Sequence, residues 1–110
     1  MSLLIFVLTL AVQGAPVADD PKLLAQAQDR CMTTYAVRQA GSGRADDAIY
    51  TEAEGGCASL NAQLFAALAV KLPPADAAAI TKELRDTAKP RFVALLARIR
   101  ADRAARAAQP

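Results

Sequence analysis

Two cysteines, Cys31 and Cys57, are the residues of this 110-residue chain best suited to chemistry. Thiols form disulfides, exchange electrons with other thiols, or bind soft metal ions. A separation of 26 positions matches neither a CxxC redox motif nor a cluster of metal ligands. Each cysteine falls in the apolar stripe of its own predicted helix, so we expect both to be buried. The pattern therefore predicts a structural disulfide, and a thiol-redox or metal-binding role is the less favoured interpretation.

Other groups that could support catalysis are scarce. The chain contains no histidine, which excludes triads and dyads that depend on an imidazole. Asp46, Tyr50 and Glu54 share one helical face by their i, i+4 spacing, but a solvated helix surface has the same pattern. Residues 41–43 (Gly-Ser-Gly) fit a turn between helices rather than a phosphate-binding loop. We therefore predict a non-enzymatic protein with no catalytic residue, no metal site and no cofactor.

The N-terminus has the layout of a secretory signal peptide. The uncharged apolar run Leu3–Val12 is shorter than the roughly 20 residues of a membrane-spanning helix, and small and then acidic residues follow it. We predict a signal peptide over residues 1–14, cleavage between Gly14 and Ala15, and a short linker over residues 15–20. The expected location is the periplasm or the extracellular space, where disulfides persist. No basic residue precedes the apolar run, and a short N-terminal core helix is the alternative.

The rest of the chain reads as helical throughout. Alanine accounts for 27 residues, whereas there are three Phe, two Tyr and no Trp, which favours helices around a thin core. Asp20 followed by Pro21 indicates a helix start, and Gly41 indicates a helix end. Pro90 either kinks one helix or separates two. We predict a single helical domain over residues 21–110, with helices over about residues 21–40, 45–72, 75–89 and 90–107.

The positions of the two cysteines predict how the first two helices pack. Cys31 lies ten residues before Gly41, and Cys57 lies twelve residues after Ala45, which places them roughly 15 and 18 Å from the turn. The fold class we predict is all-α: a disulfide-stapled antiparallel helical hairpin plus a C-terminal helix, in a small bundle of three or four helices. The pair at residues 55–56 (Gly-Gly) indicates close approach of the first helix, or alternatively a kink.

The pattern Cys31-x3-Tyr35-Ala36-x-Arg38, then a Gly/Ser turn, then Ala53-x3-Cys57, resembles small exported two-cysteine helical proteins of proteobacteria. The resemblance covers roughly the first two helices. Proteins of that type are mostly uncharacterised, so the resemblance implies a fold and a location and does not imply an activity.

The C-terminal helix is strongly basic. From Lys89 onward there are six basic residues and one acidic, a net charge of +5, whereas the preceding part carries −3. We expect its apolar side to pack on the far end of the second helix, residues 60–72, or to lie on an anionic membrane surface. The predicted function is protein interaction or a chaperone-like role with an unknown protein partner, and association with anionic lipid is the alternative. Nucleic-acid binding is not expected, because the main body is acidic. The candidate interaction surface comprises Arg91, Arg98, Arg100, Arg103 and Arg106.

Overall fold

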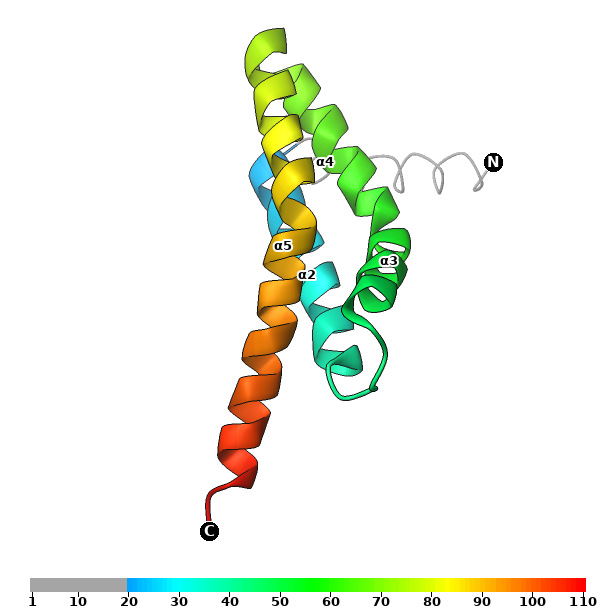
Figure 1. The fold of residues 1–110 in the computed structure, drawn as a ribbon. Helices are drawn as coiled ribbons and strands as arrows, with labels where there is room; N and C mark the ends of the chain where they lie inside the picture. Colours follow the sequence, from blue (N-terminus) through cyan, green and yellow to red (C-terminus); the bar gives the residue numbers. More distant parts are fainter. Residues whose placement is uncertain (1–19) are drawn as a thin grey trace, which may run out of the picture.

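The computed structural model describes residues 20–110. The predicted signal peptide and its cleavage site between Gly14 and Ala15 lie outside these residues. The regular secondary structure of the described part is entirely helical, which confirms the all-α class (Figure 1). Its helices are α2 (Pro21–Gln39), α3 (Asp46–Gly56), α4 (Ala58–Lys71) and α5 (Pro74–Ala107).

Both ends of α2 follow from local sequence. The Asp20 carboxylate accepts a hydrogen bond from the backbone N–H of Lys22 at 2.9 Å, and Pro21 occupies the first turn, where no N–H partner is needed. After α2 the chain reverses through a loop in which Gly43 has φ = 78°, a left-handed conformation that favours glycine. The expected boundaries of the first helix therefore agree with the structure to within one residue.

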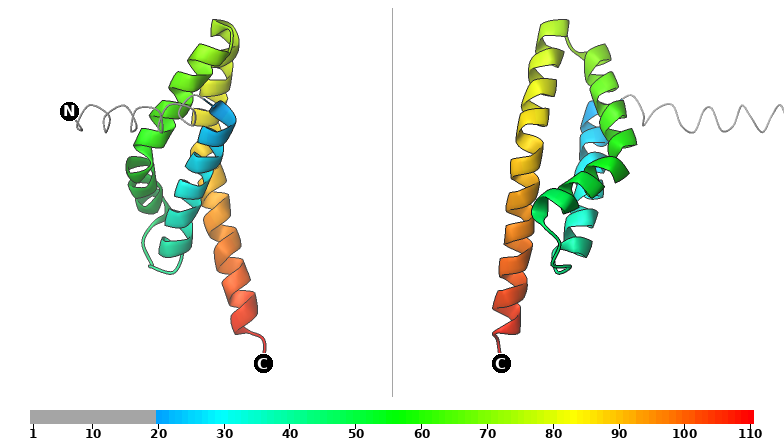
Figure 2. Two further views of the ribbon diagram at one scale, coloured as in Figure 1. Left: turned by 180° about the vertical axis from the view of Figure 1, so that it is seen from behind. Right: turned by 45° about the vertical axis from the view of Figure 1, so that its right-hand side comes forward.

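The single helix predicted over residues 45–72 is wrong. The chain leaves helical geometry at Cys57, whose φ and ψ are −106° and 10°, and the direction changes between α3 and α4 (Figure 2). A Cβ atom at Gly56 would collide with the hydroxyl group of Tyr35 on α2. Gly55 and Gly56 thus mark both the bend between α3 and α4 and a close approach. The group that approaches Gly56 is the Tyr35 side chain of α2.

The separate helices predicted over residues 75–89 and 90–107 form one helix, α5, which runs through Pro90. Proline deprives the Asp86 carbonyl of its helical hydrogen bond. Immediately downstream, Phe92 and Leu96 are buried, and their packing offsets that loss. The C-terminal turns of α5 extend beyond the other helices, and residues 101–110 are all exposed (Figure 1).

The core consists of two separate apolar clusters. The turn cluster lies near the loop between α2 and α3, and the tip cluster lies near the connection between α4 and α5. The apolar side of the C-terminal half of α5 belongs to the turn cluster, not to residues 60–72 as expected from the sequence. Residues 60–72 are covered instead by Leu24 of α2 and Leu84 of α5. The turn cluster comprises Ala36, Ala40, Ile49, Ala53, Phe92 and Leu96, and the tip cluster comprises Leu24, Leu64, Ala67 and Leu68.

Candidate functional site

Cys31 and Cys57 lie at disulfide distance, with their Sγ atoms 2.03 Å apart and their Cα atoms 6.0 Å apart. This confirms that the two cysteines pair. Cys57 is buried as expected, whereas Cys31 is only partly buried. The bond joins the middle of α2 to the point where α3 meets α4, so it holds the bend against α2.

Within residues 20–110, no group of three or more Cys, Asp or Glu side chains is arranged to hold a metal ion. No helix of this part of the chain is both long and apolar enough to cross a bilayer.

Two arginines of the predicted interaction surface bind the end of α2 instead. The Arg100 side chain donates from Nε to the Ala40 carbonyl and from Nη1 to the Asp46 carboxylate, both at 2.8 Å. Arg103 donates to the Val37 carbonyl at 2.7 Å. The last carbonyls of a helix lack partners within the helix and carry its negative end, so cations stabilise them. These arginines join α5 to the end of α2 and the start of α3, a role that sequence reasoning missed.

The other three arginines of that surface lie at exposed positions of α5. Arg91 lines a groove. Neither Arg98 nor Arg106 forms an ion pair with another residue of the described part. Two of the five arginines thus bind other helices, and three remain exposed.

The predicted acidic face is also divided. Asp46 pairs with Arg100, whereas the Tyr50 hydroxyl donates to the Glu54 carboxylate at 3.3 Å. Partial burial, and then the negative charge of Glu54 and its hydrogen bond, raise the pKa of Tyr50 above its ordinary value. Tyr50 is therefore a neutral hydrogen-bond donor at physiological pH, and this face does not provide a pair of carboxylates.

A groove of about 770 Å³ opens between the two apolar clusters; we call it the central groove. Helices α2, α4 and α5 form its walls, and α3 contributes at one end. The side chains that line it are Lys22, Ala25, Gln26, Gln28, Asp29, Met32, Thr33, Tyr50, Glu54, Asn61, Leu64, Phe65, Leu84, Arg85, Ala88, Arg91, Phe92 and Leu95.

The register of the helices shows what lies at the middle of the central groove. Leu24 belongs to the tip cluster with Leu84 packed against that cluster, Ala36 and Leu96 share the turn cluster, and Arg100 donates to the Ala40 carbonyl. Helices α2 and α5 therefore run in the same direction, with an offset of about 60 positions. Gln28 is therefore level with Ala88. On α4, one turn from Leu64, Asn61 lies at about the same level.

The middle of the central groove is polar and underfilled. Among residues 20–110, Gln28 Oε1 is buried without a hydrogen-bond partner, and the Asn61 amide lines the same groove. A buried acceptor without a partner costs about 1–3 kcal/mol. In the sequence, the same level is marked in each of three apolar stripes by a residue that is polar or small. These residues are Gln28 between Leu24 and Met32, Asn61 between Cys57 and Leu64, and Ala88 between Leu84 and Phe92.

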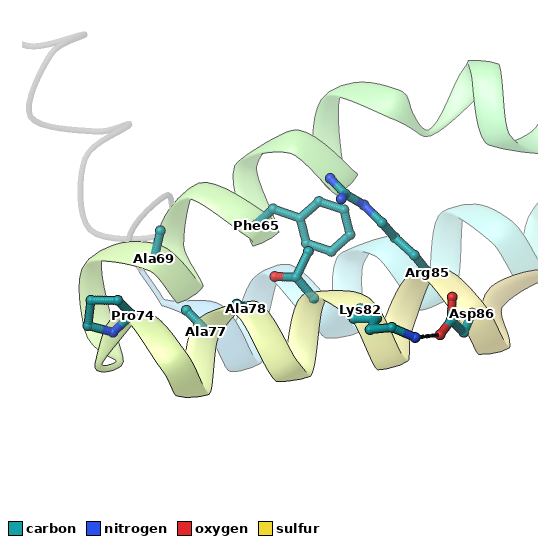
Figure 3. Close-up of a pocket in the computed structure, with 9 residues that line it drawn as sticks. Phe65, Ala69, Pro74, Ala77, Ala78, Lys82, Arg85 and Asp86 are labelled. Carbon is teal, nitrogen blue, oxygen red and sulfur yellow. Dashed lines mark hydrogen bonds and ion pairs between the residues drawn. The ribbon is translucent and has the colours of Figure 1, made fainter.

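A second, smaller groove of about 570 Å³ lies between α4 and α5 (Figure 3). The Arg85 guanidinium lies 4.8 Å from the centroid of the Phe65 ring, and Lys82 pairs with Asp86 at 2.6 Å (Figure 3). Three of the four polar side chains that line this smaller groove, Lys82, Arg85 and Asp86, thus already interact with other side chains of the protein. The central groove, with the buried and unpartnered Oε1 of Gln28, is the stronger candidate site.

No protein-family model, curated protein or solved structure matches this chain.

Proposed function

We propose that this is a small exported, non-enzymatic binding protein with a chaperone-like role, which holds an apolar segment of another exported protein in the central groove. The observation that carries the proposal is that groove, unfilled between two apolar clusters. Its volume of about 770 Å³ is within the roughly 300–1,000 Å³ typical of ligand sites, which combine apolar walls with a few polar groups.

The disulfide supports the proposal because it keeps the walls in place. In our proposal α2 forms an antiparallel hairpin with α3 and α4, stapled by Cys31 and Cys57, and α5 closes one side. A disulfide that encloses 27 residues stabilises a fold by about 3.5 kcal/mol in the chain-entropy model. Such a staple lets a small protein leave part of its interior unfilled. It is also compatible with the export that the N-terminal residues predict.

Binding of the neutral dye Nile red to the purified, oxidised protein tests the proposal. Ala88→Leu fills the middle of the central groove, and Ala94→Leu makes the same change on an exposed position of α5. We expect saturable binding with one site in the wild type and in the Ala94→Leu variant, and affinity weakened by at least about tenfold in Ala88→Leu. Absence of saturable binding, or equal affinity in the two variants, would refute the proposal.

Association with anionic lipid is the second candidate, and the exposed Arg98 and Arg106 favour it. The apolar residues Phe92 and Leu96 of the same helix are buried in the turn cluster and are not available for insertion. Binding would therefore rest on charge alone and would be lost in high salt. Sedimentation with phosphatidylglycerol and phosphatidylcholine vesicles at low and high salt checks this candidate. Equal binding to both vesicles would count against it.

A further inference from the structure

We propose that the occupant of the central groove is an extended peptide segment, with two apolar side chains in the two ends of the groove and the backbone between them hydrogen-bonded to Gln28 and Asn61. The inference rests on the proposed function, namely that this groove is a binding site. It adds the conformation of the bound segment, the spacing of its apolar residues and the groups that recognise its backbone.

The central groove has two apolar ends, one in each cluster. Leu84 and Phe92 mark these ends on α5, and eight residues of helix between them correspond to about 12 Å. An extended chain rises about 3.3 Å per residue and its side chains alternate between two faces, so side chains four positions apart span about this distance and point to the same side. The tip end is formed by Leu64, Phe65 and Leu84, and the turn end by Met32, Phe92 and Leu95.

The buried amide oxygen of Gln28 favours an extended occupant over a helical one. In a helix the backbone N–H groups are hydrogen-bonded to carbonyls of the same helix and are not free for another partner. An extended chain presents its N–H groups to a neighbour, and one of them can donate to Gln28 Oε1.

The two amides at the middle of the groove favour a peptide over a lipid chain. A hydrocarbon chain that joined the two apolar ends would cover Gln28 and Asn61 and offer them no hydrogen bond. Each peptide unit carries one donor and one acceptor, which are the groups that a side-chain amide pairs with. The terminal torsion of glutamine is soft, so the amide can turn its buried Oε1 toward an incoming N–H group.

The charges at the rim also favour a peptide backbone over an anionic headgroup. Three basic side chains line the central groove, and two acidic ones lie among them. Neither sign predominates strongly, so the rim does not select an anion. The five charged residues are Lys22, Asp29, Glu54, Arg85 and Arg91.

The first arm of the test uses ten-residue dansyl peptides of glycine and serine that contain two leucines. We expect leucines four positions apart to bind at least about tenfold more tightly than adjacent leucines, because only the spaced pair fills both ends. N-methylation of the backbone between the spaced leucines is expected to weaken binding about fivefold, because it removes a donor. Equal affinity for spaced and adjacent leucines would overturn the inference.

The second arm separates a peptide from a hydrocarbon chain. The double variant Gln28→Leu and Asn61→Leu is expected to weaken binding of the spaced peptide about tenfold, without weakening binding of dansyl-undecanoic acid. The control is Gln63→Leu, which changes an exposed amide on α4. Tighter wild-type binding of the acid than of the peptide, together with a further gain in the double variant, would identify a lipid chain as the occupant and refute the inference.

The failures of the two proposals are distinguishable. Nile red binding that is lost in Ala88→Leu, with no binding of any peptide, refutes the peptide inference and leaves the groove as a binding site. If neither dye nor peptide binds, both proposals fall. The comparison of spaced with adjacent leucines uses the wild-type protein, so it stands even if the double variant does not fold.

Discussion

The turn cluster and the tip cluster both bury apolar side chains of α2, but against different helices: α3 and α5 at the turn cluster, and α4, with Leu84 of α5 beside it, at the tip cluster. Half of the turn cluster is alanine, and four of its six members are 0% exposed. The tip cluster has three leucines and one alanine, and all of its members retain 3–8% exposure. Both clusters border the central groove, through Phe92 and Leu64, but the members of the turn cluster are more completely shielded from solvent.

The difference shows how α2 and α5 can pack closely at the turn cluster and still leave a groove further along. Ala36 and Ala40 on α2 let the backbone of α5 approach closely, since the distance between packed helices depends on the side chains at the contact. The approach brings Arg100 within hydrogen-bond distance of the Ala40 carbonyl. Three turns earlier Gln28 faces Ala88, and neither side chain fills the space between the helices.

The largest effect that should distinguish the clusters comes from one substitution made in each. Leu96→Ala in the turn cluster should lower the free energy of unfolding by about 4 kcal/mol, because its surroundings are closed and cannot collapse into the cavity. Leu68→Ala in the tip cluster should lower it by about 2 kcal/mol, because neighbouring side chains can shift. Urea denaturation measures both values. Equal losses would contradict the comparison.

Loss of the disulfide should weaken both clusters, because Cys31 and Cys57 lie between them. Cys31→Ala combined with Cys57→Ala should lower the free energy of unfolding by about 3.5 kcal/mol. Urea denaturation of the double variant, beside the oxidised wild type, measures the loss. An unchanged denaturation midpoint would show that the remaining packing alone holds the bend at Cys57.

Among the arginines of α5, only those that bind the end of α2 beside the turn cluster should contribute to stability. Arg100→Ala removes two hydrogen bonds and leaves the Ala40 carbonyl and Asp46 without this partner, which should cost about 1.5 kcal/mol for a half-buried charged group. Arg98→Ala on the same helix is the control and should change stability by less than about 0.5 kcal/mol. Thermal unfolding measures both variants. Equal effects would remove the structural role assigned to Arg100.

The smallest predicted effect has the opposite sign. Gln28→Leu should raise the free energy of unfolding by about 1 kcal/mol, because it removes a buried acceptor that has no protein partner and adds apolar surface to the groove wall. Gln63→Leu, on the exposed face of α4, should leave it nearly unchanged. Chemical denaturation measures the gain. Destabilisation by Gln28→Leu would mean that the amide already contributes to the fold.

Much of the fold could be predicted from local patterns. Asp20 and Pro21 specify the start of α2 through a cap and a fixed φ angle, and these depend only on neighbouring residues. The pairing of Cys31 and Cys57 followed from their positions in two apolar stripes at similar distances from a turn. The break at Cys57 was not predicted, because the glycine pair was compatible with either a close contact or a bend, and both occur.

The candidate site was the least predictable part. The sequence indicated the arginines of α5 as one surface, but Arg100 and Arg103 bind carbonyls more than 50 residues away in the chain. No local pattern encodes such a pairing. Gln28, Asn61 and Ala88 each interrupt an apolar stripe, but only the register of three helices shows that these interruptions meet at one level.

The sequence by itself determined the helical class, the cap of α2 and the pairing of the cysteines, because backbone propensity, capping and hydrophobic periodicity act over a few residues. The tertiary structure alone decided that α5 continues through Pro90, that two arginines close the end of α2, and that a groove remains between two clusters. These features depend on which side chains meet across helices, and that is set by packing over the whole chain.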